Sequence, residues 1–263
     1  MFGLQKATQV TSGPDDVATL RWLAEQYAYP TRPSSAPCLA RPYLRVNMVS
    51  TVDGAVTFDG RSGDLGGPGD KAIFRVLRAL ADVVLVGART AVTEGYGQPA
   101  ADDVFAAGRR AREQTPAPAL ALVSRSLSIP ADFGPVGHPD TVVLTCRAAA
   151  AERRDALLAA GATVIDCGDG SVEVDQVLDL CAERGWVRVL GEGGPSLLGT
   201  FIDADAVDEV CMTTSPTLVA GDAGRIAHHS SPGRKHPMRP ATILTDEDGF
   251  VFTRWTRDVG GKE

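Results

Sequence analysis

The chain has 263 residues, 44% of them hydrophobic, and a formal net charge of −7. This size allows one large domain or two small ones with a full core, which excludes wholesale disorder. The negative charge argues against nucleic-acid binding through a basic surface, and no stretch approaches the roughly 18 apolar residues of a membrane-spanning helix.

The N-terminus and the cysteines indicate the compartment. Residues 1–10 lack the basic-then-apolar layout of a secretory signal. The cysteines are odd in number, widely spaced and without a C-x-x-C pair, which argues against a zinc site or a disulfide framework. We therefore expect a cytoplasmic protein with reduced, mostly buried cysteines. They are Cys38, Cys146, Cys167, Cys181 and Cys211.

Hydrophobic periodicity predicts an extension followed by one α/β domain. Residues 1–40 should form an extension, with a helix capped by Asp15 or Asp16 and a Pro- and Ser-rich linker over 30–37. The main domain, 41–258, opens with a strand over 43–50. A glycine-rich loop over 54–67 comes next, and its length is typical of a functional loop.

The rest of the domain alternates between strands and helices. Further strands are predicted over 82–87, 119–123, 141–145, 162–167, 187–190, 207–214, 241–245 and 250–257, and helices from Pro68, within 100–118, and over 149–160, 174–184 and 195–203. The last two strands are joined by an Asp-Gly turn at 248–249. The alternation predicts a mostly parallel sheet with antiparallel C-terminal edge strands and helices on both faces.

Three strand ends carry chemistry that suits a phosphorylated ligand, and ligands of open α/β sheets bind beyond such ends. Gly87 to Thr90 offers backbone N–H groups and a hydroxyl. Gly193, Gly194, Pro195 and Ser196 form a glycine turn at a helix N-terminus, a favourable place for an anion. Ser124 and Arg125 suit a phosphate monoester such as the 2′-phosphate of NADP. Together they predict a dinucleotide site, although the G-x-G-x-x-G fingerprint is absent.

Several charged residues have both a structural and a functional interpretation. Asp53 and Glu192 follow strands and are candidate catalytic carboxylates, but either could simply cap a loop. Arg78 could be a solvent-facing helix residue or a ligand contact. The histidines at 228, 229 and 236 lack carboxylates or cysteines at ligand spacing, so we predict a solvated loop and no metal site.

The motifs in this order resemble the RibD C-terminal family, the pyrimidine reductases of riboflavin biosynthesis, which share the dihydrofolate reductase-like fold. The resemblance covers about residues 41–256. The matching motifs are Arg41-Pro42-Tyr43, Ser50-x-x-Asp53-Gly54, Gly60-Arg61-Ser62-Gly63, Leu77-Arg78-Ala79-Leu80-Ala81-Asp82, Gly87-x-x-Thr90, Glu192-Gly193-Gly194-Pro195-x-Leu197, Val207-Asp208-Glu209, and Ser215-Pro216 with Leu218.

The resemblance implies reduction by NADPH of a ribosylamino to a ribitylamino group on a phosphorylated pyrimidine, and a homodimer. It implies that Val49, Asp64, Thr90, Glu94, Ser124 and residues 194–200, including Leu197, line the cofactor site. Ser62, Arg78 and Glu192 would face the substrate, with Arg78 suited to its phosphate. Asp53 would border the meeting point of nicotinamide and substrate.

The chain departs from the bifunctional family members in ways that concern the substrate. The zinc-deaminase motifs H-x-E and P-C-x-x-C are absent, so at most the reductase half is present. Asn47 stands where bacterial forms often have Lys, and Gly95-Tyr96-Gly97-Gln98 follows Glu94 in place of Asp-Pro. Two alternatives therefore stay open: a dihydrofolate or pterin reductase, which would need a carboxylate such as Asp53 or Glu192 for the ring nitrogens, and a non-catalytic nucleotide-binding protein.

Overall fold

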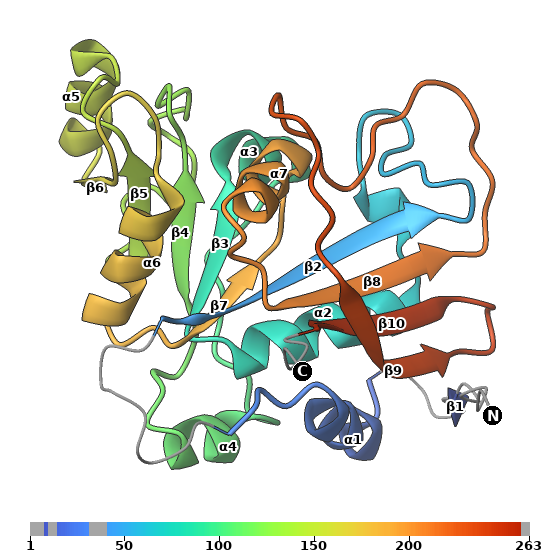
Figure 1. The fold of residues 1–263 in the computed structure, drawn as a ribbon. Coiled ribbons are helices and arrows are strands. Elements are labelled where there is room, and N and C mark those ends of the chain that lie inside the picture. The colour runs from blue at the N-terminus through green and yellow to red at the C-terminus, as the bar shows by residue number, and fades with distance from the viewer. Residues whose placement is uncertain (1–7, 10–14, 32–40, 259–263) are drawn as a thin grey trace, which may run out of the picture.

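One ten-stranded sheet organises the chain (Figure 1). The computed structural model describes residues 8–9, 15–31 and 41–258. The strand order is β1-β9-β10-β8-β2-β7-β3-β4-β5-β6. The strands are β1 (Thr8–Gln9), β2 (Tyr43–Thr51), β3 (Val83–Gly87), β4 (Ala119–Val123), β5 (Thr141–Thr145), β6 (Thr163–Asp166), β7 (Arg188–Gly191), β8 (Glu209–Ser215), β9 (Met238–Thr245) and β10 (Val251–Arg257).

The predicted sheet class is confirmed. All neighbouring strands run parallel except at β10, which is antiparallel to both β8 and β9. Gly249, in the predicted Asp-Gly turn between β9 and β10, has φ +87°, a conformation that glycine adopts without steric cost. Strand β7 lies between β2 and β3, so the first strands of the domain are not direct neighbours.

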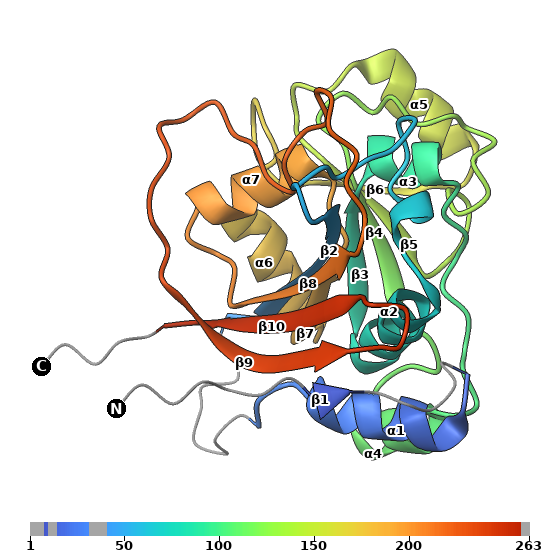
Figure 2. The same cartoon turned by 90° about the vertical axis from the view of Figure 1, so that its right-hand side faces the viewer.

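Helices cover both faces of the sheet, as predicted, because the central strands are apolar on both sides. Val84 and Val86 of β3 face the core layer under α1, α2, α3 and α5, whereas Val83 and Leu85 face α6 and α7. Figure 2 shows these two layers on opposite sides of the strands. The helices are α1 (Val17–Gln26), α2 (Pro68–Leu80), α3 (Ala88–Glu94), α4 (Ala106–Ala111), α5 (Ala151–Ala159), α6 (Val174–Glu183) and α7 (Pro195–Asp203).

The predicted extension contributes to the same core. Asp16 caps α1 by accepting a hydrogen bond from the backbone N–H of Thr19 at 2.8 Å. Leu20 and Tyr27 are buried against α2. The two-residue strand β1, which was not predicted, pairs in parallel with β9. Most of the predicted linker over 30–37 lies outside the described residues.

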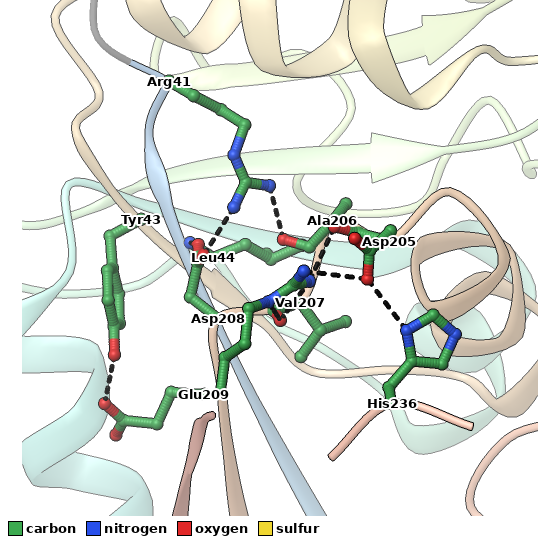
Figure 3. Close-up of polar contacts among 10 residues, drawn as sticks. Arg41, Tyr43, Leu44, Asp205, Ala206, Val207, Asp208, Glu209 and His236 are labelled. Carbon is green, nitrogen blue, oxygen red and sulfur yellow. Dashed lines mark hydrogen bonds and ion pairs between the residues drawn. The ribbon is translucent and has the colours of Figure 1, made fainter. Parts of the chain in front are cut away.

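Two of the motifs that carry the resemblance join the starts of β2 and β8 (Figure 3). Arg41 donates to the carbonyl of Ala206 at 2.6 Å and forms an ion pair with Asp208. Asp208 also accepts from the backbone N–H of Leu44 at 2.8 Å, and Tyr43 donates to Glu209 at 3.0 Å. These residues therefore fix the parallel pairing of β2 with β8, which aligns the strand ends that carry the site.

The described cysteines are reduced and lie in the core, and the described helices are short. Cys146, Cys167, Cys181 and Cys211 are free and buried, as predicted, and burial raises the pKa of Cys167 to about 11. Cys38 lies outside the described residues. None of the helices in the described part of the chain is long and apolar enough to span a membrane.

Candidate active site

Two glycine turns meet at the carboxyl ends of β3 and β7. The backbone N–H of Gly87 donates to the carbonyl of Gly193 at 2.7 Å. A β-carbon on Gly194 would lie 2.3 Å from the Thr90 hydroxyl, and one on Gly87 would lie 3.4 Å from the Gly194 nitrogen. The close approach therefore requires glycine at 194, whose buried backbone lines the two cavities described below.

Helix α7 begins directly at this junction, as predicted. Gly194 is its N-cap and Pro195 its first residue, a position where proline loses no hydrogen bond. The first turn of a helix presents unpaired N–H groups and a positive dipole end. The junction consequently suits a phosphate or diphosphate.

The main cavity opens on one side of the junction and has a volume of about 400 Å³. Its lining comes from the end of β2, the loop before α2, and α2, α3 and α7. The lining residues are Asn47, Met48, Val49, Val56, Thr57, Gly60, Ser62, Gly63, Asp70, Lys71, Phe74, Arg89, Thr90, Thr93, Glu94, Tyr96, Glu192, Gly194 and Pro195. Of the predicted site residues, Val49, Ser62, Thr90, Glu94 and Glu192 are thus brought together here.

Glu192 is held by Arg78 at the inner wall of this cavity. The Arg78 Nε and Nη2 donate to the two carboxylate oxygens at 2.8 and 2.7 Å. The Glu192 side chain is 1% exposed and that of Arg78 is 22% exposed. The guanidinium also lies over the rings of Phe74 and Tyr96, at 4.1 and 5.0 Å from their centroids. Both charges are therefore compensated within the protein.

Tyr96 belongs to the segment that departs from the bifunctional family pattern. Burial raises the pKa of its phenol, and the neighbouring Glu192 carboxylate raises it further. The phenol consequently stays protonated and is placed to donate to the Glu192 carboxylate.

Glu94 fixes the glycine-rich loop over the cavity. It accepts hydrogen bonds from the backbone N–H and the hydroxyl of Ser62, at 2.9 and 3.0 Å. Asp64, in the short 3₁₀ turn Gly63–Leu65, does not line the cavities described here. Glu94 thus fixes the position of the loop and keeps Ser62 at the cavity wall.

Asp53 holds the loop that follows β8. Its carboxylate accepts from the backbone N–H groups of Val219 and Ala220 at 3.2 and 2.7 Å and from the Thr51 hydroxyl. These hydrogen bonds lower the pKa of Asp53. Asp53 does not line either cavity. Its observed contacts connect the end of β2 to the loop after β8.

A second cavity, of about 710 Å³, opens on the other side of the glycine junction. Its lining includes Gly87, Ser124, Arg125, Ser196 and Leu197, which joins the remaining predicted strand ends, and it shares Arg89, Thr90, Gly194 and Pro195 with the main cavity. The two cavities therefore lie on either side of one glycine junction, which is the start of α7. That shape fits a dinucleotide.

The histidine-bearing loop packs onto α7, and His228 and His229 line the second cavity. The His228 backbone N–H donates to the carbonyl of Pro195, and its ring lies 3.1 Å from the Ser196 hydroxyl. His229 lies 3.8 Å from Asp203, and His236 pairs with Asp205 at 2.8 Å. Across the described ranges, no group of three or more His, Cys, Asp or Glu side chains could hold a metal.

Sequence reasoning missed several cavity residues. Asp70 and Lys71 belong to the first turns of α2, where charged residues are common for reasons of solubility and helix polarity. Arg89 was part of a predicted turn but was not singled out. Their functional position becomes visible only in the structure, where the first turn of α2 lines the main cavity. Hydrophobic periodicity in the sequence does not predict such a position.

Comparison with known proteins then gave the family. A sequence model described as the RibD C-terminal domain matches residues 42–252. The chain belongs to this family. The resemblance predicted from the motifs is therefore confirmed.

Members of the family with similar sequences agree with the predicted function. A 2,5-diamino-6-ribosylamino-4(3H)-pyrimidinone 5′-phosphate reductase of Aquifex aeolicus is 27% identical over 191 residues, covering 70% of this chain and 81% of the relative. A protein of the same name from Archaeoglobus fulgidus is 23% identical over 182 residues, covering 69% and 83%. Both names describe reductases.

Solved structures of the family share the fold. A pyrimidine reductase-like protein of Corynebacterium diphtheriae superposes with a TM-score of 0.78 at 23% identity, covering 89% of this chain and 98% of that one. The riboflavin biosynthesis reductase of Saccharomyces cerevisiae gives 0.63 at 13% identity, covering 90% and 99%. The predicted fold class is confirmed by both.

Proposed function

We propose that the chain is an NADPH-dependent reductase that converts a ribosylaminopyrimidine 5′-phosphate to its ribitylamino form in riboflavin biosynthesis. The observation that supports this best is the glycine junction of Gly87 with Gly193 and Gly194, which has one cavity on each side. The names of the relatives from Aquifex and Archaeoglobus give the substrate class.

The cofactor fits the chain's own groups. The glycine junction and the first turn of α7 would hold the diphosphate, because the N-terminus of α7 has no side-chain cap and its N–H groups can bind an anion. Ser124 and Arg125 in the second cavity would contact the adenosine half, and Arg125 could pair with a 2′-phosphate. Nicotinamide would then lie in the main cavity near Val49 and Thr90. When bound, it would supply a hydride to C1′ of the opened ribose.

The residues of the main cavity would orient the substrate. Glu192 would accept hydrogen bonds from substrate hydroxyl or ring N–H groups in a geometry fixed by Arg78. Glu94 would keep Ser62 at the wall, and Tyr96 would offer its phenol as a donor. For Asp53 the geometry favours a positioning role, because its carboxylate holds the loop at Val219 and Ala220.

The decisive experiment follows the consumption of NADPH by absorbance with three substrates in parallel. These are the 5′-phosphates of 5-amino-6-ribosylaminouracil and its 2,5-diaminopyrimidinone counterpart, and dihydrofolate. Turnover of either ribosylaminopyrimidine, with the ribitylamino product identified by mass spectrometry, supports the proposal. Turnover of dihydrofolate alone would assign the pterin function to the same site, and NADPH binding without any turnover would favour a binding protein.

A further inference from the structure

Three carboxylates line the main cavity in the described part of the chain: Asp70, Glu94 and Glu192. Glu94 accepts two hydrogen bonds from Ser62, and Glu192 is bound by both donor groups of Arg78. Asp70 forms no ion pair with any residue in the described ranges. It is consequently the cavity carboxylate that keeps its charge available for a ligand.

The surroundings of Asp70 make this charge costly to the protein alone. Asp70 lies in the first turn of α2 and is half-buried, and Val56 and Phe74 line the same cavity. A β-carbon on Gly66 would come within 2.4 Å of its Oδ2, so the loop backbone packs against the carboxylate. Burial raises its pKa, and the hydrogen bond with Thr213 and the nearby charge of Lys71 offset this only in part. A half-buried carboxylate that forms no ion pair is destabilising unless a ligand pairs with it.

We propose that Asp70 binds the 2-amino and N3–H edge of an aminopyrimidinone ring and thereby selects substrates that carry this edge over their uracil counterparts. The inference rests on the proposed function, because it assigns the ring subsite of that reaction. Its carboxylate offers two acceptor oxygens, and the edge offers two adjacent N–H donors. Two parallel, charge-assisted hydrogen bonds result.

A uracil ring cannot make the same pair. At C2 it carries a carbonyl oxygen, which would face one carboxylate oxygen, so that N3–H is the single donor left for the two acceptors. Such a mismatch rejects a ligand more strongly than the loss of an apolar contact, because a buried acceptor stays unsatisfied. Asp70 would therefore discriminate through repulsion as well as attraction.

Dihydropterins carry the same 2-amino and N3–H edge, so Asp70 could bind either a diaminopyrimidinone or a dihydropterin. The test compares both with the uracil form, using the full chain, the isosteric Asp70→Asn variant and the control Asp179→Asn. Asp179 is an exposed carboxylate of α6, on the opposite face of the sheet. Asparagine can donate to the uracil C2 carbonyl while accepting from N3–H. Asp70→Asn should therefore favour the uracil ring.

We expect the unmodified chain to prefer the diaminopyrimidinone phosphate over the uracil phosphate by about 100-fold in kcat/KM. Asp70→Asn should lower kcat/KM for the diamino substrate by at least about tenfold and narrow or reverse the preference. Asp179→Asn should match the unmodified chain. Equal use of both ribosyl substrates by the unmodified chain, or an unchanged preference in Asp70→Asn, would overturn the inference.

A binding measurement separates this inference from the proposed function. Calorimetry with the free bases 2,6-diaminopyrimidin-4-one and 6-aminouracil reports ring recognition without turnover. Binding of the diamino base that is lost in Asp70→Asn supports the ring assignment even if no ribosyl phosphate is reduced, and turnover of dihydrofolate alone would then identify the pterin source. Equal binding of both bases rejects the ring assignment and leaves the reductase proposal to its own test.

Discussion

Arg78 and Glu192 are 114 positions apart in the sequence, yet they form two parallel hydrogen bonds of 2.8 and 2.7 Å at the wall of the main cavity. The pair joins α2 to the end of β7, and both elements also contribute to the cavity. A single charge-compensated contact thus connects two elements that line the same cavity.

Removing both members of this pair should cost less than the two single losses added together. We expect Glu192→Gln to lower the free energy of unfolding by about 2 kcal/mol, below the value for a fully buried pair because Arg78 is 22% exposed. The double variant Arg78→Gln/Glu192→Gln should lose less than the sum of the single losses, since no uncompensated charge stays behind. Urea unfolding of the four proteins measures the coupling; strictly additive losses would contradict it.

The stability lost on substituting Gly194 should be restored by a second substitution that removes the colliding atom. Gly194→Ala places a β-carbon 2.3 Å from the Thr90 hydroxyl oxygen, so we expect a clear loss of thermal stability. Replacing Thr90 by Ala in the same chain removes that oxygen and should restore most of the loss. The comparison is a thermal denaturation series with Thr90→Ala alone as the reference. If the double variant is no more stable than Gly194→Ala, the collision is not the cause.

Arg125 should distinguish the two nicotinamide cofactors. If its guanidinium pairs with a 2′-phosphate in the second cavity, Arg125→Gln will raise KM for NADPH by about tenfold or more, the usual effect of losing a charge-assisted hydrogen bond. KM for NADH should hardly change, because NADH lacks that phosphate. Steady-state kinetics with both cofactors provides the test, and equal effects on both would place Arg125 elsewhere.

Lys71 and Arg78 are competing anchors for the substrate phosphate. Lys71 is exposed and lines the main cavity, whereas Arg78 is already paired with Glu192. We expect Lys71→Gln to raise KM for a ribosyl phosphate substrate by about tenfold and to leave binding of the unphosphorylated nucleoside unchanged. Arg78→Gln should weaken both ligands equally. A phosphate-specific loss in Arg78→Gln instead would support the role that the sequence motif implied.

Asp70 should give the protein a stability that falls as pH rises. The folded-state pKa of its carboxyl lies above the ordinary value of 3.8, so folding disfavours the ionised form. Its contribution is therefore most favourable below that ordinary value and becomes unfavourable as pH rises through the folded-state pKa. We expect Asp70→Asn to be more stable than the unmodified chain at neutral pH, with the difference vanishing in acid. Urea unfolding across this range would show it.

Much of the fold could be predicted from the sequence because its signals are local. The apolar run of β3 at 83–87 and the glycine, proline and apolar sequence at the start of α7 each specify an element within a few residues. Strand β1 could not be predicted, because two residues carry no periodicity and its pairing with β9 is non-local. At the start of α3 the sequence predicts a turn, because a helix of only seven residues gives little periodic signal.

The site was predictable where backbone chemistry defines it and less so where side chains meet. The glycine turns and the residues Ser124 and Arg125 could be placed because parallel strands end at one edge. That Arg78 neutralises Glu192, or that Asp53 holds Val219 and Ala220, depends on tertiary packing. Asp70 has the ordinary appearance of an acidic residue in a first helical turn, and only the cavity reveals its position.

The position of β7 between β2 and β3 has a consequence for how the chain folds while it is being translated. A nascent chain that has emerged only as far as residue 187 contains both flanking strands but not the one that joins them. Strands β2 and β3 can pair with β7 only after more than two thirds of the polypeptide has been made. Contacts between residues so far apart in the sequence also form slowly. Until then the edges of β2 and β3 are unpaired and open to wrong partners. A ribosome-bound fragment ending before 188 should therefore be sensitive to proteases, whereas one that includes α7 should become resistant.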